Sequence, residues 1–159
     1  MSLNEEVDML KRIPFFAGIE PSKLKLLAFT SERVAYEAGQ VLFRQGDMGD
    51  AAYVILEGDA EVLVDTDIGL VMVALLGRND FVGEIAILCD VPRTATVRAR
   101  QRLVTLRIKK ELFLRLLMEF PQMAVAMLRE LAHRLELTNQ KLRVAVADAD
   151  KLTRAAAET

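Results

Sequence analysis

The spacing of apolar residues changes twice along the chain and divides it into three parts. Residues 4–30 have apolar positions at helical spacing, interrupted at Pro14 and resumed after Pro21. Residues 31–108 instead alternate short apolar runs with glycine turns, as strands do. These runs are Val34–Tyr36, Val41–Phe43, Tyr53–Leu56, Ala60–Val64, Leu70–Leu76, Ala95–Ala99 and Leu103–Ile108. Helical spacing returns over residues 110–157. The pattern predicts an α+β fold: an eight-stranded β jelly-roll barrel with N-terminal helices and a long C-terminal helix.

The predicted C-terminal helix carries a heptad pattern. After Pro121 it contains no glycine or proline as far as Ala157. Apolar or small residues follow one another in alternating steps of three and four, at Leu128, Leu131, Leu135, Thr138, Leu142, Ala145, Ala149, Leu152 and Ala156. This spacing favours a parallel two-stranded coiled coil, and hence a homodimer formed through Leu128–Ala156. The alternative is an amphipathic helix that packs on the barrel of its own chain.

Composition narrows the range of partners. The chain has 159 residues, of which 52% are hydrophobic and 28% are charged, as expected of one globular domain. A net charge of −2 offers no basic field for nucleic acid, and the longest apolar run, Leu70–Leu76, is too short to span a bilayer. The single cysteine, Cys89, fits a cytoplasmic location and is expected to be a small apolar filler. With one histidine, His133, a multi-histidine metal site is excluded on one chain, and no metal or cofactor is expected.

The most informative stretch for chemistry is Phe81–Ala95. Gly83 lacks a Cβ, so its backbone allows a ligand to come close. Residues Glu84–Leu88 can form one helical turn whose free N–H groups point at an anion. Arg93 is a fork of donors suited to phosphate oxygens, and the Glu84 carboxylate can accept from hydroxyl groups. Together these residues predict a site that holds both a phosphate and a sugar.

Two segments resemble a known family. The chain reads FVGEIAIL and then PRTATV between Phe81 and Val97, which closely resembles the phosphate-binding cassette of cyclic nucleotide-binding domains. Residues Ala132–Leu142, AHRLELTNQKL, resemble the dimer helix of members of the catabolite activator type. The resemblance extends from about Leu10 to Leu142. It implies one domain over residues 1–159, with the cassette at residues 81–95, and a cyclic nucleotide bound inside the barrel.

The resemblance also implies roles for the cassette residues that follow Gly83. Glu84 would accept a hydrogen bond from the ribose 2′-hydroxyl. Arg93 and the amides of Ile85 and Ala86 would hold the cyclic phosphate. Thr94 and Ala95 would complete this phosphate cradle through hydroxyl and backbone contacts.

Residues outside the cassette would surround the base. Val62 and Val73, on neighbouring strands, would line the purine site, and the C-terminal helix would form a lid. Thr138 would contact the adenine, and Asn139, where the family member has serine, would reach the ligand of the other subunit. In related kinases a threonine at the place of Thr94 accompanies a preference for cGMP. The longer match around Thr138 favours cAMP over cGMP.

These implications predict a sensor that binds a cyclic nucleotide and signals through its C-terminal helix and dimer interface to an unknown downstream protein. One alternative is a regulatory fragment of a larger transcription factor, channel or kinase, and another is a dimerisation domain that binds no ligand. No helix-turn-helix can be drawn before Thr159, so this chain alone is not expected to bind nucleic acid. The phosphate clamp has no nucleophile–base pair, which argues against an enzyme.

Overall fold

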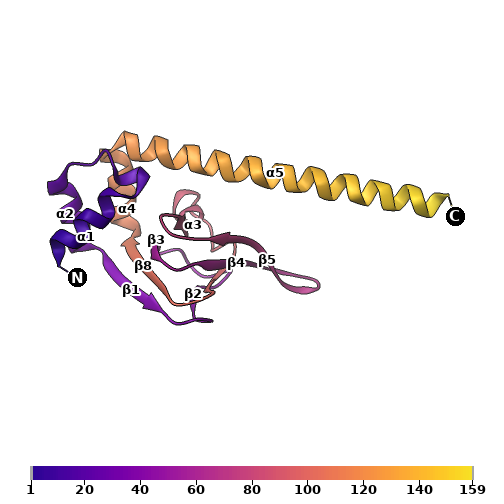
Figure 1. Ribbon diagram of the computed structural model, residues 1–159, viewed down its shortest axis with the longest axis horizontal. Coiled ribbons are helices and arrows are strands. Elements are labelled where there is room, and N and C mark those ends of the chain that lie inside the picture. Colours follow the sequence, from indigo (N-terminus) through magenta and orange to yellow (C-terminus); the bar gives the residue numbers. More distant parts are fainter. Residues whose placement is uncertain (1, 159) are drawn as a thin grey trace. The chain divides into compact units, whose positions relative to one another are not determined.

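The computed structural model describes residues 2–158 (Figure 1). The chain divides into two compact units, one ending at Met123 and the other beginning at Ala124. Each unit is described by itself. The first contains the predicted barrel, and the second contains most of the long C-terminal helix.

The N-terminal part is helical, as predicted. Its elements are α1 (Leu3–Lys11), the 3₁₀ helix η1 (Pro14–Phe16) and α2 (Pro21–Thr30). Helix α1 begins with a capping box, because the Glu5 amide donates to Ser2 Oγ and the Ser2 amide donates to the Glu5 carboxylate. Both later helices begin with proline, whose fixed φ and missing N–H suit the first turn.

Within residues 2–158, eight strands form two antiparallel sheets, which confirms the predicted number. One sheet has the order β1-β8-β3-β6 and the other the order β2-β7-β4-β5. The strands are β1 (Glu32–Tyr36), β2 (Val41–Phe43), β3 (Ala51–Glu57), β4 (Ala60–Thr66), β5 (Gly69–Leu76), β6 (Phe81–Val82), β7 (Thr96–Ala99) and β8 (Leu103–Lys109). Strand β3 begins two residues before the predicted start at Tyr53, because Ala51 and Ala52 are buried in it despite the weak strand preference of alanine.

Both sheets contribute side chains to one apolar core. Strand β3 is buried from Ala51 to Leu56, and β8 is buried at most of its positions. The core cluster contains Ala51, Tyr53, Ile55, Ala60, Leu76, Val82, Val97, Ala99 and Leu103. The barrel interior is therefore filled mainly by aliphatic residues, and the chemistry of any site must come from the few polar groups among them.

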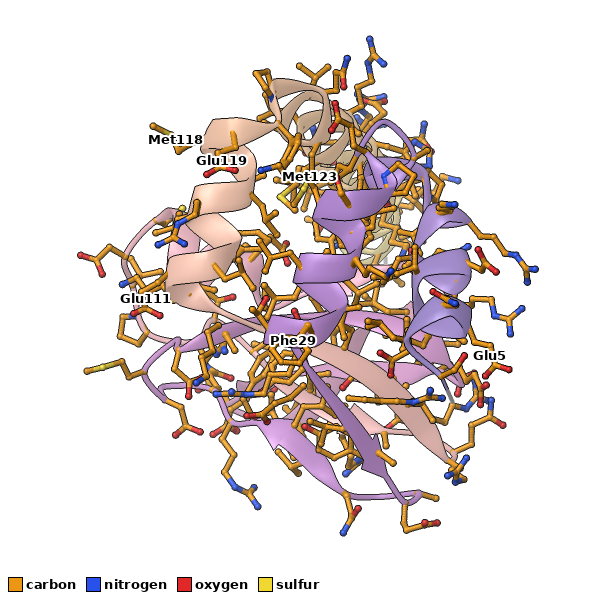
Figure 2. The ribbon with its side chains drawn as sticks, turned by 90° about the vertical axis from the view of Figure 1, so that its left-hand side faces the viewer. Glu5, Phe29, Glu111, Met118, Glu119 and Met123 are labelled. Atoms are coloured by element: carbon orange, nitrogen blue, oxygen red, sulfur yellow. The ribbon has the colours of Figure 1, made fainter. Side chains whose placement is uncertain are left out.

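Helix α4 (Lys110–Glu119) follows β8 directly and contacts β3 and β8. Its buried face contains Phe113 and Leu116. Figure 2 shows the side of the first unit where α4 and α2 lie, with Phe29 and Met118 on the outside and Met123 enclosed. Helix α4 thus covers part of the barrel.

Helix α5 (Pro121–Ala157) is continuous over 37 residues, which confirms the predicted long helix. Four leucines of the heptad seam are 59–73% exposed: Leu128, Leu135, Leu142 and Leu152. Its pairing with a second chain stays a prediction. Over residues 2–158, none of the helices combines the length and the apolar character needed to cross a bilayer.

Candidate ligand-binding site

The cassette has the local structure predicted from its sequence. Strand β6 leads into Gly83, and helix α3 (Glu84–Leu88) follows as one short helix. Gly83 has φ +88°, in the left-handed region that favours glycine. A Cβ added there would lie 2.8 Å from Arg93 Nη1 and 3.3 Å from the Ala51 carbonyl oxygen. The glycine therefore makes room for the arginine of the same cassette.

Arg93 is a charged residue inside the barrel, and only 3% of it is exposed. Its Nη1 donates to the carbonyl of Gly83 and its Nη2 to the carbonyl of Ala51, both at 2.6 Å. The guanidinium carbon lies 4.0 Å from the centroid of the Phe43 ring. Within the described part of the chain, Arg93 Nε is buried and has no hydrogen-bond partner. The guanidinium is thus firmly held but keeps an unused donor.

A chain of ion pairs connects Arg93 to the outside of the barrel. Arg93 Nη2 lies 3.7 Å from Asp50 Oδ1, and the other carboxylate oxygen of Asp50 accepts from Arg107 Nη2 at 2.8 Å. Arg107 Nη1 in turn lies 3.9 Å from Glu32. The Asp50 side chain is 68% exposed, so water screens its charge. Asp50 therefore neutralises the buried guanidinium only in part.

The electrostatic environment of Arg93 reflects this partial neutralisation. Burial lowers the pKa of Arg93, and the nearby Tyr53, Asp50 and Glu84 oppose that effect. For Arg107, burial also acts to lower the pKa, but interaction with Tyr53, then with Asp50 and other acids, raises it on balance. An arginine remains charged at any physiological pH, so the barrel holds a permanent cation next to Gly83.

The other predicted cassette residues have different exposures. Glu84 and Ala86 are buried, at 3% and 5% exposed, on the same short helix. Ile85 is 44% exposed, Thr94 is exposed and Ala95 is half-buried. The structure thus brings Gly83, Glu84 and Arg93 together, and their ligand contacts stay predictions.

The predicted residues outside the cassette lie on three elements. Val62 on β4 is partly buried against the core cluster, whereas Val73 on β5 is 49% exposed. Thr138 and Asn139 belong to α5, in the second unit. The Thr138 hydroxyl donates to the Arg134 carbonyl at 2.9 Å, the back-bond that a helical threonine commonly makes. Its oxygen can still accept from a ligand.

The expectation for Cys89 is wrong. Cys89 is exposed, at the C-terminal cap of α3. The buried side of this short helix is formed by Glu84, Ala86 and Ile87. Since α3 ends at Leu88, the cysteine falls outside the packed turn and fills no space in the core.

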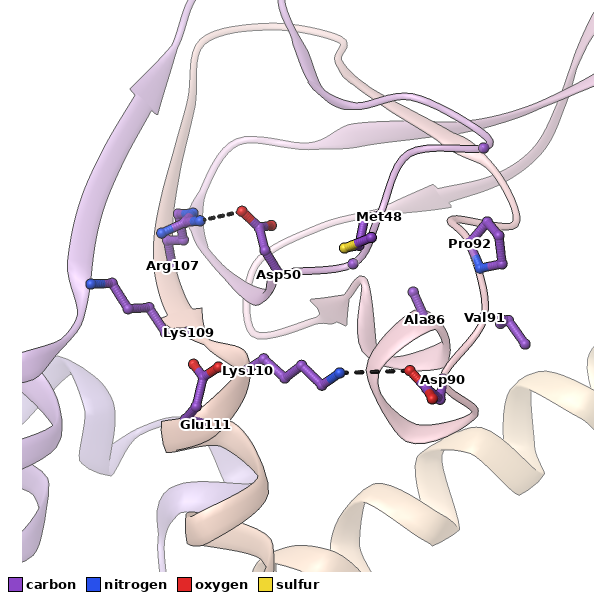
Figure 3. Close-up of a pocket in the computed structure, with 12 residues that line it drawn as sticks. Met48, Asp50, Ala86, Asp90, Val91, Pro92, Arg107, Lys109, Lys110 and Glu111 are labelled. Atoms are coloured by element: carbon purple, nitrogen blue, oxygen red, sulfur yellow. Dashed lines mark hydrogen bonds and ion pairs between the residues drawn. The ribbon is translucent and has the colours of Figure 1, made fainter.

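A cavity of about 660 Å³ lies beside the cassette (Figure 3). The loop 46–50, the segment 90–92 and the junction of β8 with α4 surround it. Asp50 and Arg107 line it, and Lys110 reaches across to Asp90 at 3.7 Å (Figure 3). Of the predicted ligand residues only Ala86 lines it, so it is not the predicted nucleotide site. Among residues 2–158 there is also no group of three or more histidine, cysteine or acidic side chains placed to hold a metal ion.

Sequence reasoning missed three residues around Arg93: Phe43, Asp50 and Ala51. Each lies more than 40 positions before the arginine, so no local motif connects them. Asp50 offers a partial signal, since it is a charge placed directly before the most deeply buried strand.

Comparison with known proteins identifies the family. Residues 33–120, from β1 to the end of α4, match the family model "Cyclic nucleotide-binding domain". The chain is 38% identical over 109 residues to a cAMP-dependent protein kinase regulatory subunit of Blastocladiella emersonii, covering 68% of this chain and 27% of that protein. The chain thus spans about a quarter of the length of such curated relatives.

Solved structures of other proteins support the same family assignment. The regulatory subunit of a cAMP-independent protein kinase A from Trypanosoma brucei aligns with a TM-score of 0.70 and 28% identity, over 80% of this chain and 46% of that chain. The Thermus thermophilus catabolite activator protein aligns with a TM-score of 0.71 and 29% identity, over 82% and 62%. The match to the family model covers more than half of the chain, including the cassette, strands β2 to β8 and all of β1 but its first residue. The chain therefore belongs to the cyclic nucleotide-binding domain family.

Proposed function

We propose that this chain is a regulatory domain that binds a cyclic nucleotide inside its barrel, with the cyclic phosphate at Arg93 and the ribose at Glu84. The observation that carries the proposal is the buried guanidinium, with Nε unpartnered and its nearest carboxylate, Asp50, only partly neutralising it. A buried cation is costly unless it is paired, and an anionic ligand would complete its pairing. A cyclic phosphate carries one negative charge and has oxygens that can accept from a guanidinium.

The proposed ligand is cAMP in preference to cGMP. Several curated relatives are cAMP-dependent protein kinase regulatory subunits. The similarity around Thr138 and Asn139 to dimer helices that contact adenine supports the same choice. The alternative ligand is cGMP, because Thr94 is exposed and can meet a guanine. The Trypanosoma brucei relative is the regulatory subunit of a cAMP-independent protein kinase A.

Calorimetric titration tests the proposal. The purified chain is first checked by mass spectrometry for nucleotide carried through purification, and is then titrated with cAMP and with cGMP. We expect saturable binding of one ligand per chain, tighter for cAMP. If a folded, nucleotide-free chain binds neither, the proposal fails and the alternative of a non-binding dimerisation domain takes its place. Tighter binding of cGMP would leave the site in place and overturn the choice of base.

Signalling is proposed to run through α5 and a dimer interface. A ligand shifts a helix arrangement only if it binds two arrangements with different affinities. The exposed heptad leucines of α5 are an apolar surface that a second copy could cover, through the seam Leu128–Ala156. A downstream protein would then read the change, in whatever larger transcription factor, channel or kinase assembly the domain serves.

Replacing two seam leucines by glutamate should separate the dimer. The double variant Leu135→Glu and Leu142→Glu removes four leucines per dimer that the proposed seam would bury, each contributing about 1.5–3 kcal/mol. The dimer dissociation constant should therefore rise by more than about 1000-fold, as measured by sedimentation equilibrium. The matched control His133→Glu and Gln140→Glu adds the same charges at the same spacing but outside the seam, and should stay dimeric. A wild-type chain that is monomeric at tens of micromolar would contradict the proposed dimer through Leu128–Ala156.

A further inference from the structure

We infer that Phe43 is a positioning residue for Arg93, orienting the guanidinium before the phosphate binds. The inference rests on the proposed function, since it assigns a role at the same site. Phe43 ends strand β2, which pairs with β7, and it faces Val97 in that pairing. Nothing in the cassette sequence points to this residue.

The guanidinium of Arg93 is restrained along two edges and over one face. Its Nη1 and Nη2 each donate to a backbone carbonyl at 2.6 Å, from Gly83 and Ala51. Such bonds lie near the plane of the guanidinium and fix its edges. The ring of Phe43 covers a face, with its centroid 4.0 Å from the guanidinium carbon. Removing the ring would leave the edges of the guanidinium hydrogen-bonded, but the guanidinium plane could then tilt.

The Phe43 ring is itself held in place. Its centroid lies 5.8 Å from that of the Tyr53 ring, at an interplanar angle of 31°. Its Cε2 lies 3.3 Å from the position where a side chain at Gly83 would begin. A glycine before α3 and an aromatic residue on β2 therefore create one slot, and Arg93 fills it.

An aromatic face has a specific advantage over a carboxylate at this position. The negative face of the ring attracts a cation and compensates part of its lost hydration. The ring carries no net charge, so it leaves the cation able to bind an anion. A carboxylate in direct contact would neutralise Arg93 and compete with the phosphate. The carboxylate that pairs with Arg93, that of Asp50, lies 3.7 Å away and is largely hydrated.

The test compares Phe43→Leu with Phe43→Tyr. Leucine keeps an apolar side chain but has no π face, so cAMP affinity should fall about 5–20-fold. Tyrosine keeps the face and should bind within about threefold of the wild type. Leu42→Ala, on the same strand and packed against the same core, controls for lost packing. If Phe43→Leu does not fold, Phe43→Met replaces it.

A spectroscopic readout separates positioning from packing. The Nε–Hε resonance of Arg93, assigned by its absence in Arg93→Met, reports the ring above the guanidinium. We expect this resonance to move in Phe43→Leu and to stay in place in Leu42→Ala. Unchanged cAMP affinity in Phe43→Leu, or an unmoved resonance, would overturn the inference. If the wild type binds neither cyclic nucleotide, the proposed function fails, and the resonance still decides whether Phe43 positions Arg93.

Discussion

Arg93→Ala should lower the affinity for cAMP by about 30- to 3000-fold while the barrel stays folded. Removing one partner of a buried charge pair costs roughly 2–5 kcal/mol of binding free energy, which is about 1.5–3.5 decades in Kd. The effect should be near the upper end, because only 3% of Arg93 is exposed and water cannot easily replace it. Calorimetric titration with cAMP measures the loss.

Two further variants separate charge from shape at the same position. Arg93→Met keeps a long apolar side chain without the charge. It should lose as much cAMP affinity as Arg93→Ala but unfold at a higher temperature than Arg93→Ala. A buried, partly neutralised cation contributes little net stability, and an apolar replacement of similar volume is tolerated. Arg93→Lys keeps the charge but cannot donate to both the Gly83 and Ala51 carbonyls as a planar fork, so its affinity should be intermediate.

Arg98 provides the control for these variants. It lies five residues further along, on β7, and pairs with Glu61 through Nε at 3.1 Å and Nη2 at 2.8 Å. Its side chain is 39% exposed and that of Glu61 is 20% exposed, so water partly screens the pair and its contribution is small. Arg98→Ala should bind cAMP within about threefold of the wild type. Full affinity in Arg93→Ala, or an equal loss in both alanine variants, would refute the anchor at Arg93.

Much of the fold was predictable because it depends on local signals. The switch between helical spacing and short runs with glycine turns located the helices and all the longer strands. The Gly83–Leu88 turn was likewise readable from residue types alone, and α3 confirms it. The signal failed where local preference and burial disagree. Alanines at the start of β3 are weak strand formers, and their burial comes from packing that the sequence pattern does not reveal.

The position of Arg93 beside Gly83 was predictable from the sequence, whereas its other neighbours were not. Arg93 and Gly83 belong to one motif, ten residues apart, whereas Phe43 and Ala51 reach Arg93 only when β2 and β3 fold against the cassette. Contacts at such separation leave no periodic signal. Cys89 shows the same limit at short range: the helix ends one residue before it, and periodicity cannot find the end of a single turn.

Gly83→Ala should reduce cAMP affinity at least about tenfold, although it changes no group expected to donate a side-chain bond to the ligand. The added Cβ would lie 2.8 Å from Arg93 Nη1, so the guanidinium must move away from a carbonyl to which it donates. One misplaced charge-assisted hydrogen bond costs about 1.5–3 kcal/mol, which is tenfold or more in Kd.

Gly39→Ala is a matched control for this variant. Gly39 has φ +87°, almost the same as the +88° of Gly83, but nothing lies within 4 Å of its added Cβ. Both variants should therefore lose about 1–2 kcal/mol of unfolding free energy from the left-handed backbone. Gly83→Ala should lose more than this, because its Cβ also displaces Arg93. Only Gly83→Ala should lose affinity for cAMP, measured by calorimetric titration beside thermal unfolding of both proteins. Equal affinities in the two variants would mean that the ligand does not depend on where Arg93 is held, and the phosphate would then have to bind elsewhere in the barrel.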